Sequence, residues 1–308
     1  MCYSAQIWAD YNKYVRVFGA DIDIHTFVDI YWTRQEEGHI KIPKGMDLSF
    51  LSPKTDEARQ IRSMIDAYDQ QQASLLEQEL FQQTKRLNDA ERTLKDKITK
   101  KALNDQRIAG NKIERAKSRL ADLRRTELLE RDSRIFPMVY APVMVSHEGR
   151  RLIKPMRYQC RPSGKPAFYD RKYPGTYNAR RDNLEGFWKG QFGHSHAIIV
   201  VETFYENVEA EDGTNTVLQF IPDDGEPMII ACLWSHWAKA GEPDLLSFAA
   251  ITDEPPPEVA AAGHDRCIVN IKPENIDAWL NPDPTNLEAL YAILDDKAKP
   301  HYEHRLAA

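Results

Sequence analysis

The feature that most constrains the fold is a run of residues, 55–108, that contains neither Gly nor Pro. It is rich in strong helix formers and places Leu80, Leu87 and Leu94 seven residues apart. A single straight helix of this length would extend roughly 80 Å at about 1.5 Å per residue, which is too long to pack wholly on a small domain. We therefore expect part of this helix to project from the body or to pair with another chain.

A second helical stretch follows the first, with Ile113, Ala116 and Leu120 at steps of three and four residues. Gly110 and Asn111 are the only helix-breaking residues between the two stretches. The pattern predicts a helical hairpin that turns at Gly110 and Asn111.

From Phe136 onward the sequence changes to short β-rich runs separated by turn-forming residues, among them "MVYAPVMVS", "HAIIVVETFYENV" and "PMIIACLWSHW". Residues 11–35 indicate one or two short helices, and the tail after residue 272 indicates two more. The predicted class is α+β. We expect a mostly antiparallel, β-barrel-like core flanked by helices, with a long, coiled-coil-like helical insertion.

The predicted domain organisation is one domain formed by residues 1–50 and 132–308, interrupted by a helical insertion at 51–131. The chain has a net charge of −6, yet residues 85–134 hold 16 Lys and Arg against 9 Asp and Glu. Two hypotheses for this basic insertion are compatible with each other. It could mediate self-association or recruit a partner protein as a coiled coil, and it could contact a phosphate backbone away from the active site.

The composition is that of a globular protein, with 42% hydrophobic and 29% charged residues and no apolar run long enough to span a membrane. The amino terminus lacks the basic and apolar segments of a secretory signal. These features predict a cytoplasmic protein, nucleoid-associated if bacterial, without a membrane partner. The four cysteines, which we expect to be free thiols, form no CxxC pair, so we predict no metal site and no cofactor.

Cys2 is the first candidate for chemistry, because removal of the initiator Met1 would leave a cysteine with a free thiol and a free α-amine. An α-amine has a pKa near 8, so a substantial fraction is neutral and nucleophilic at physiological pH. The amine can form a Schiff base with an aldehyde, and the thiol can close it to a five-membered thiazolidine. An internal cysteine cannot do this.

Three further segments place polar residues where they could serve a reaction. Asn178 and Arg180 stand two apart, so on an extended segment they project to the same side, where Arg180 with Arg181 could meet a phosphate and Asn178 could make a directional hydrogen bond. Glu206 ends an apolar run, where burial could raise its pKa, although Glu202 is a competitor for this role. His264 precedes another β-rich run and suits proton transfer.

Taken in order, these segments resemble the SRAP family, the SOS response-associated peptidases that process abasic sites. The similarity consists of Met-Cys at the start, "VYAP" at 139–142, "MRYQCRP" at 156–162, "NAR" at 178–180, "FYE" at 204–206, "GHDR" at 263–266 and "DAWLNP" at 277–282. The segments span nearly the whole chain outside the helical insertion.

The resemblance implies a protein that binds single-stranded DNA containing abasic sites. Cys2 would link covalently to the aldehyde of the ring-opened abasic site as a thiazolidine. Asn178 would position the sugar or the cysteine, Glu206 would assist proton transfer, and His264 would act as acid or base. The same residues would support the autopeptidase activity, a thiol-type hydrolysis, that gives the family its name.

The resemblance also implies a set of DNA contacts. Arg180 would meet a phosphate, and the strand would be held by further residues: Pro142, Arg157, Tyr158, Arg161 and Pro162. Family members usually carry Gly-Arg after the cysteine, where this chain has Tyr3 and Ser4.

Two alternatives to this function remain open from the sequence. Cys2 could be the nucleophile of an amino-terminal cysteine hydrolase or peptidase without a DNA role. The chain could also be a non-catalytic adaptor that recruits partners through its long helices.

Overall fold

The core of the computed structural model, which describes residues 3–209 and 213–307, is a closed ring of five strands. Strand β10 pairs with β5, β5 with β4, β4 with β7, β7 with β9, and β9 again with β10. Only the β10–β5 contact in this ring is parallel. The five strands are β4 (Tyr140–His147), β5 (Arg150–Tyr158), β7 (His196–Glu209), β9 (Met228–Lys239) and β10 (Glu242–Asp253).

Seven further strands extend the sheet beyond this ring. β1 lies antiparallel to β7, β6 lies parallel to β10, and β11 lies antiparallel to β10. The added strands are β1 (Ser4–Ile7), β2 (Asp21–Ile22), β3 (Arg134–Ile135), β6 (Asn178–Arg180), β8 (Asn215–Pro222), β11 (Cys267–Ile268) and β12 (Tyr302–Leu306).

Turn chemistry explains why β4 and β5 pair antiparallel. Glu148 and Gly149, which join β4 to β5, both have positive φ, at 51° and 75°. A two-residue turn of this hand matches the twist of the strands that it joins.

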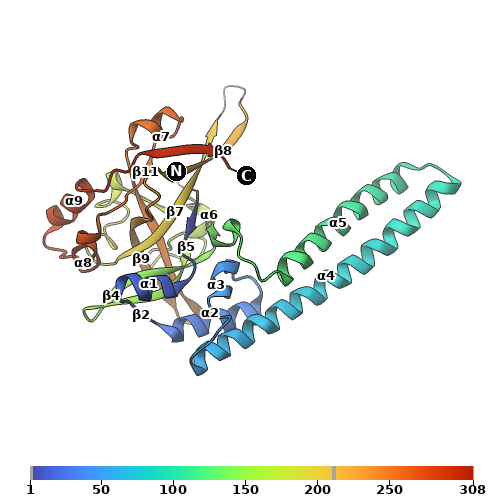
Figure 1. Cartoon of the computed structure of the whole chain (residues 1–308), viewed down its shortest axis with the longest axis horizontal. Coiled ribbons are helices and arrows are strands. Elements are labelled where there is room, and N and C mark those ends of the chain that lie inside the picture. Colours follow the sequence, from blue (N-terminus) through green and yellow to red (C-terminus); the bar gives the residue numbers. More distant parts are fainter. Residues whose placement is uncertain (1–2, 210–212, 308) are drawn as a thin grey trace.

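Short helices cover the barrel and close its core (Figure 1). Tyr14 of α1 is fully buried, and its hydroxyl accepts a hydrogen bond from the Val200 amide of β7 at 2.9 Å. These helices are α1 (Tyr11–Phe18), α2 (Ile24–Glu37), α3 (Lys44–Leu48), α6 (Tyr169–Lys172), α7 (Pro257–Ala261), α8 (Ile276–Leu280) and α9 (Leu287–Asp295), with 3-10 turns at Glu130–Ser133, Arg181–Asn183 and Pro273–Asn275. The predicted α+β class, with a mostly antiparallel sheet flanked by helices, is confirmed.

Two long helices, α4 (Asp56–Asp96) and α5 (Lys100–Arg124), form a hairpin that projects from the barrel (Figure 1). The start of α4 packs on α2 with Ala58, Ile61 and Ile65 buried. Farther out, the two helices bury small and apolar side chains against each other, namely Leu76, Ala90, Ala102, Ala109, Ile113, Ala116 and Leu120. The predicted long helix and hairpin are present. Whether residues 51–131 are an insertion into one domain stays a prediction.

The hairpin turns at residues 97–99, so the predicted turn at Gly110 was wrong. Thr99 begins α5, because its hydroxyl accepts a hydrogen bond from the Ala102 amide at 3.1 Å. Gly110 lies inside the helix, between the buried Ala109 and Ile113. A helical glycine costs about 1 kcal/mol relative to alanine, and packing of its neighbours outweighs that cost.

Replacing Gly110 with Ala is expected to raise the free energy of unfolding by about 0.5 to 1 kcal/mol, because alanine is the better helix former. No atom lies within 4 Å of the position that the new Cβ would take. Urea denaturation measures the change. Gly38→Ala is the control, since Gly38 ends α2 with a φ of +69° and the same substitution there should destabilise. Destabilisation by Gly110→Ala would contradict a continuous α5.

Among the described residues, no helix is both long and apolar enough to cross a membrane.

Candidate active site

The site is built around Glu206, a fully buried carboxyl on β7. Strand β1 runs antiparallel beside this part of β7, with Ser4 opposite Tyr205. Burial raises the pKa of Glu206 to about 8; the negative charge of Asp265 acts in the same direction, and a hydrogen bond from the Tyr3 backbone amide opposes it. Glu206 therefore holds a proton at neutral pH in surroundings where most carboxyls are ionised.

His264 reaches Glu206 from the loop between α7 and β11, and its Nε2 lies 3.1 Å from Glu206 Oε2. Gly263 makes this approach possible. It has a φ of +92°, and a Cβ at its position would lie 2.9 Å from Val208 Cγ1 of β7. The glycine of the "GHDR" segment is therefore required by backbone conformation and by close packing on β7.

The positions of the protons on Glu206 and His264 follow from the contact made by Nδ1, the second ring nitrogen of His264. Nδ1 lies 2.8 Å from the Arg266 carbonyl oxygen, a contact that needs the proton on Nδ1. The Arg266 amide is also near Nδ1, at the longer distance of 3.4 Å. Burial lowers the pKa of His264, so the ring is neutral and its Nε2 lone pair faces Glu206. Protonated Glu206 can then donate a hydrogen bond to Nε2, and the two groups can exchange one proton.

Asn178 begins β6 and pairs with Ala250 of β10. Its side chain is 4% exposed, and neither amide atom has a hydrogen-bond partner among the residues that the structure describes. The preceding Tyr177 makes an edge-to-face contact with Tyr3, with 6.1 Å between ring centroids. Asn178 is thus a buried amide next to the residue that leads into β1, with both a donor and an acceptor available.

Arg180 lies at the exposed end of the same strand. It pairs with Asp182 at 2.6 Å, and Asp182 also lies 3.6 Å from Arg266 in the His264 loop. This places Arg180 at the border of the loop that carries His264. Glu202, the competitor of Glu206, instead pairs with Lys13 at 3.2 Å and is partly exposed.

The other five side chains that were expected to contact DNA are either paired with Asp170 or buried. Arg157 and Arg161 both bind Asp170, at 2.9 and 2.5 Å, and Arg157 is only 6% exposed. Pro142 and Pro162 are buried, Pro142 in the β4–β5 ladder opposite Pro155. Tyr158 is 2% exposed and packs on Phe248 and Tyr177. An ion pair with Asp170 and burial in the core leave these five side chains without access to a DNA strand, so we do not retain them as contacts.

Arg134 is a residue that the sequence did not single out. Its Nε and Nη2 lie 3.1 and 3.0 Å from the Ser4 hydroxyl oxygen, and its guanidinium lies over the Tyr205 ring at 3.5 Å. No acidic side chain in the described part of the chain pairs with it. Burial lowers the pKa of Arg134, yet a guanidinium stays charged at neutral pH. The pairing of β1 with β3, which no local pattern encodes, brings this cation to the site.

The cysteines differ in their suitability as nucleophiles. Cys160, Cys232 and Cys267 are free but buried, at 0 to 5% exposure. Burial raises the pKa of Cys160 and of Cys267 to about 12, and that of Cys232 higher still. At neutral pH these three thiols are protonated and unreactive. Cys2 lies outside the described residues.

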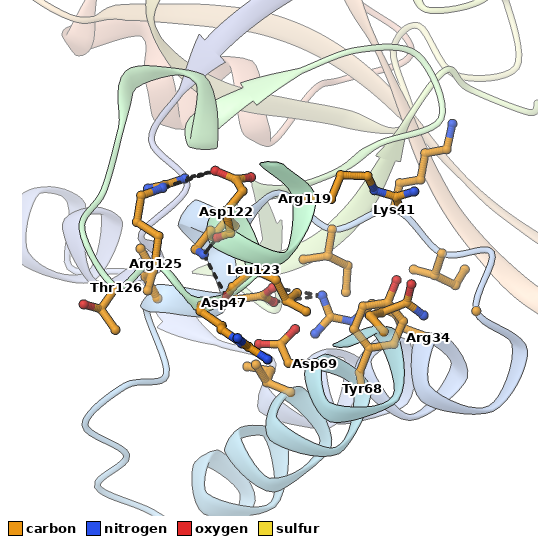
Figure 2. Close-up of a pocket in the computed structure, with 18 of the residues that line it drawn as sticks. Arg34, Lys41, Asp47, Tyr68, Asp69, Arg119, Asp122, Leu123, Arg125 and Thr126 are labelled. Carbon is orange, nitrogen blue, oxygen red and sulfur yellow. Dashed lines mark hydrogen bonds and ion pairs between the residues drawn. The ribbon is translucent and has the colours of Figure 1, made fainter. Parts of the chain in front are cut away.

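A pocket of about 750 Å³ lies between the root of the hairpin and helices α2 and α3, and neither Glu206 nor His264 lines it (Figure 2). Inside it, Arg34 is 3% exposed, binds Asp47 at 3.0 Å and lies over the rings of Tyr31 and Tyr68. At its wall, Lys44 donates to the carbonyl oxygens of Asp122 and Leu123. These contacts fix the root of the hairpin to the barrel. In the described part of the chain, no group of three or more His, Cys, Asp and Glu could hold a metal ion.

The model of SOS response associated peptidase (SRAP) matches residues 99–306, which is more than half of the chain. The chain belongs to the SRAP family. The matched region contains Asn178, Glu206 and His264, whereas β1 lies before it. Membership supports an SRAP-type function connected with DNA damage and the SOS response.

Three of the solved structures similar to this SRAP protein come from two bacteria. One protein from Bordetella bronchiseptica is 18% identical, with 57% of this chain and 87% of that chain covered and a TM-score of 0.47. A phage-related protein from the same organism is also 18% identical, with 60% and 85% covered and a TM-score of 0.45. A protein from Bacteroides thetaiotaomicron is 14% identical, with 57% and 78% covered and a TM-score of 0.47. No curated protein matches the sequence.

Proposed function

We propose that this protein forms a reversible covalent link with abasic sites in single-stranded DNA through Cys2. The observation that carries the proposal is the contact of His264 with Glu206 at 3.1 Å, beside the strand that begins two residues after Cys2. The burial of the other three cysteines supports the choice of nucleophile, because none of them could reach a DNA aldehyde.

The chemistry begins at the α-amine of mature Cys2. The amine adds to the aldehyde carbon of the ring-opened sugar, and the resulting carbinolamine loses water to become a Schiff base. The leaving hydroxyl needs a proton, which Glu206 holds at neutral pH. The thiol then adds to the carbon of the protonated C=N bond, its proton returns to Glu206, and a neutral thiazolidine forms. Overall, one aldehyde and one aminothiol give one thiazolidine and one water.

Three further side chains have roles in this proposal. His264 accepts a proton at Nε2 and returns it, so it restores Glu206 between steps. The amide of Asn178 orients the sugar or the amine through its two unused hydrogen-bonding atoms. Arg180 and Arg134 meet phosphates on the two sides of the lesion, Arg134 in place of the arginine that the family carries after its cysteine.

The test is an adduct assay with single-stranded DNA that contains one uracil, treated with uracil glycosylase to create the abasic site. The protein is expected to give a heat-resistant, slower-migrating band with this DNA, and none with the untreated strand. Cys2→Ala should abolish the band. Intact mass spectrometry first establishes that Met1 is absent, because a blocked amine cannot form a Schiff base. Lack of an adduct with the Met1-free protein would refute the proposal.

The autopeptidase activity implied by the family is a second proposal for the same residues. The only residue before Cys2 in this sequence is Met1. A protein produced in cells without methionine aminopeptidase activity should still lose Met1 if the activity is its own, and Glu206→Gln should then retain it.

A further inference from the structure

The two halves of the hairpin carry opposite net charges. Residues 56–84 and 113–124, nearest the barrel, hold six Lys and Arg against eight Asp and Glu. Residues 85–112, which form the distal half, hold nine Lys and Arg against four Asp and Glu. A helical arm that needed only to be solvated would have both signs interspersed along its length. The net positive charge of the distal half suits a negatively charged partner.

Most of the distal cations have no acidic partner in the hairpin. Arg86 pairs with Asp105 at 2.5 Å, Lys112 with Glu79 at 3.5 Å, and Arg92 lies 3.9 Å from Asp89. The other six are exposed and form no ion pair with any residue that the structure describes: Lys85, Lys95, Lys97, Lys100, Lys101 and Arg107.

The highest density of unpaired charge is at the turn. Lys95, Lys97, Lys100 and Lys101 lie within seven residues, on both sides of the turn that joins α4 to α5. Ile98, between them, is 76% exposed. We call these four lysines the tip cluster.

The arm holds the tip cluster at a fixed distance from the barrel. Its two helices are joined by buried alanines and by the Arg86–Asp105 and Lys112–Glu79 ion pairs. Its root is fixed by the contacts of Arg34 and Lys44 around the pocket in Figure 2. From Tyr68 to Asp96 the arm extends roughly 40 Å at about 1.5 Å per residue.

We infer that the tip cluster binds the phosphate backbone of DNA that flanks the strand held at the barrel. This inference rests on the proposed function, since the DNA bound beside Glu206 is taken to be the molecule that continues to the tip. Four closely spaced ammonium groups without acidic partners match a polyphosphate and need no particular base sequence.

Two other partners fit the tip less well. A membrane-binding helix needs a broad apolar face, whereas the tip offers Ile98 and, one turn along α5, the half-exposed Leu103. A second copy of the chain would bring one tip cluster against another if the arms met tip to tip, and like charges repel. A phosphate backbone needs no apolar face, and its negative charge is attracted to the lysines.

The length of the arm determines how long a DNA molecule held at the barrel must be to reach the tip cluster. Base pairs of a duplex are about 3.4 Å apart, so 40 Å corresponds to roughly 12 base pairs. A strand of six nucleotides seated at the barrel is too short to reach the tip cluster, whereas the same strand continued by 30 base pairs of duplex is long enough.

The experiment compares the full-length protein with its Lys95→Gln/Lys97→Gln/Lys100→Gln/Lys101→Gln variant on undamaged DNA, by fluorescence anisotropy. The probes are a six-nucleotide strand and the same strand with a 30-base-pair duplex on its 5′ or its 3′ side. We expect equal affinities for the short strand. For at least one tailed probe, the variant should bind at least tenfold more weakly in low salt. Its slope of log K against log salt should also be lower by up to about 3.6, at about 0.9 per phosphate contact.

A control variant with the same change in charge is Lys41→Gln/Lys54→Gln/Lys189→Gln/Lys299→Gln, whose four lysines are exposed and distant from the tip in sequence. It should keep more of its affinity for the tailed probe than the tip variant. Equal losses in both variants, or no loss in the tip variant on either tailed probe, would overturn the inference. Tip-dependent binding to vesicles of 30% phosphatidylserine, with unchanged DNA affinity, would overturn it in favour of a membrane partner. Failure of the proposed function is seen separately, as absence of an adduct on abasic DNA.

Discussion

Glu206→Gln is expected to slow adduct formation with abasic single-stranded DNA by roughly 10²- to 10⁴-fold, the usual contribution of a general acid or base. Gln keeps the shape of the side chain and can still donate a hydrogen bond to His264 Nε2, but it cannot release a proton to a leaving hydroxyl. The rate is measured by quenching the reaction at a series of times and separating the adduct by denaturing electrophoresis. Noncovalent affinity for undamaged DNA should stay unchanged.

The same substitution should make the protein more stable at high pH. The pKa of Glu206 is about 8 in the folded state and about 4.3 in an unfolded chain. Between these values the unfolded state has released a proton that the folded state retains, so the stability of the wild type falls as the pH rises from about 4.3 to about 8. Gln does not ionise and avoids this loss. The gain in free energy of unfolding, variant minus wild type, should therefore be larger at pH 9 than at pH 4. The expected difference between the two gains is on the order of 4 kcal/mol.

Glu202→Gln is the matched control, because Glu202 lies on the same strand but is partly exposed and pairs with Lys13. It should change neither the rate nor the pH dependence of stability appreciably. A slower Glu206 variant that shows no gain in stability at pH 9 would mean that the carboxyl is already ionised at neutral pH. It would then act as a base and not as the acid proposed above.

The fold was predictable where local pattern and local chemistry agree. The heptad spacing of Leu80, Leu87 and Leu94 predicted a long helix, and alternating β-rich runs predicted an antiparallel sheet. The position of the hairpin turn was not predictable in this way. Glycine is a stronger turn signal than threonine, yet Thr99 caps α5 and Gly110 lies within it, because packing along the hairpin determines where the helices can end.

The candidate site was predictable only in part, for a similar reason. Glu206 and His264 were singled out from the sequence, and the structure brings them to 3.1 Å. Arg157 and Arg161 looked like phosphate contacts because a sequence does not show that Asp170 will lie between them. Arg134 was missed because its place beside Ser4 depends on the pairing of β1 with β3, two strands far apart in the sequence.

Asp170→Ala is expected to lower the free energy of unfolding by about 3 to 5 kcal/mol, the usual cost of leaving a buried charge without its partner. Asp170 is the ion-pair partner of both Arg157 and Arg161, whose side chains are 7% and 11% exposed. Burial alone would raise the pKa of Asp170, but hydrogen bonds from Arg161 and Arg157 hold it below its usual range, so the carboxylate is ionised at neutral pH. Urea denaturation at pH 7 measures the loss.

The control for this prediction is Asp182→Ala, which removes the exposed partner of Arg180 and should cost less than about 1 kcal/mol, as surface ion pairs do. The arginine partners of these two aspartates can be compared in the same way, because Arg161 is assigned to the fold and Arg180 is the arginine proposed to bind DNA. If Arg161 serves the fold, Arg161→Gln destabilises the protein and leaves the salt dependence of DNA binding unchanged, whereas Arg180→Gln reduces that dependence with little effect on stability. A loss below 1 kcal/mol for Asp170→Ala, together with a reduced salt dependence for Arg161→Gln, would show that the guanidinium of Arg161 is available to DNA. Arg161 would then return to the set of DNA contacts.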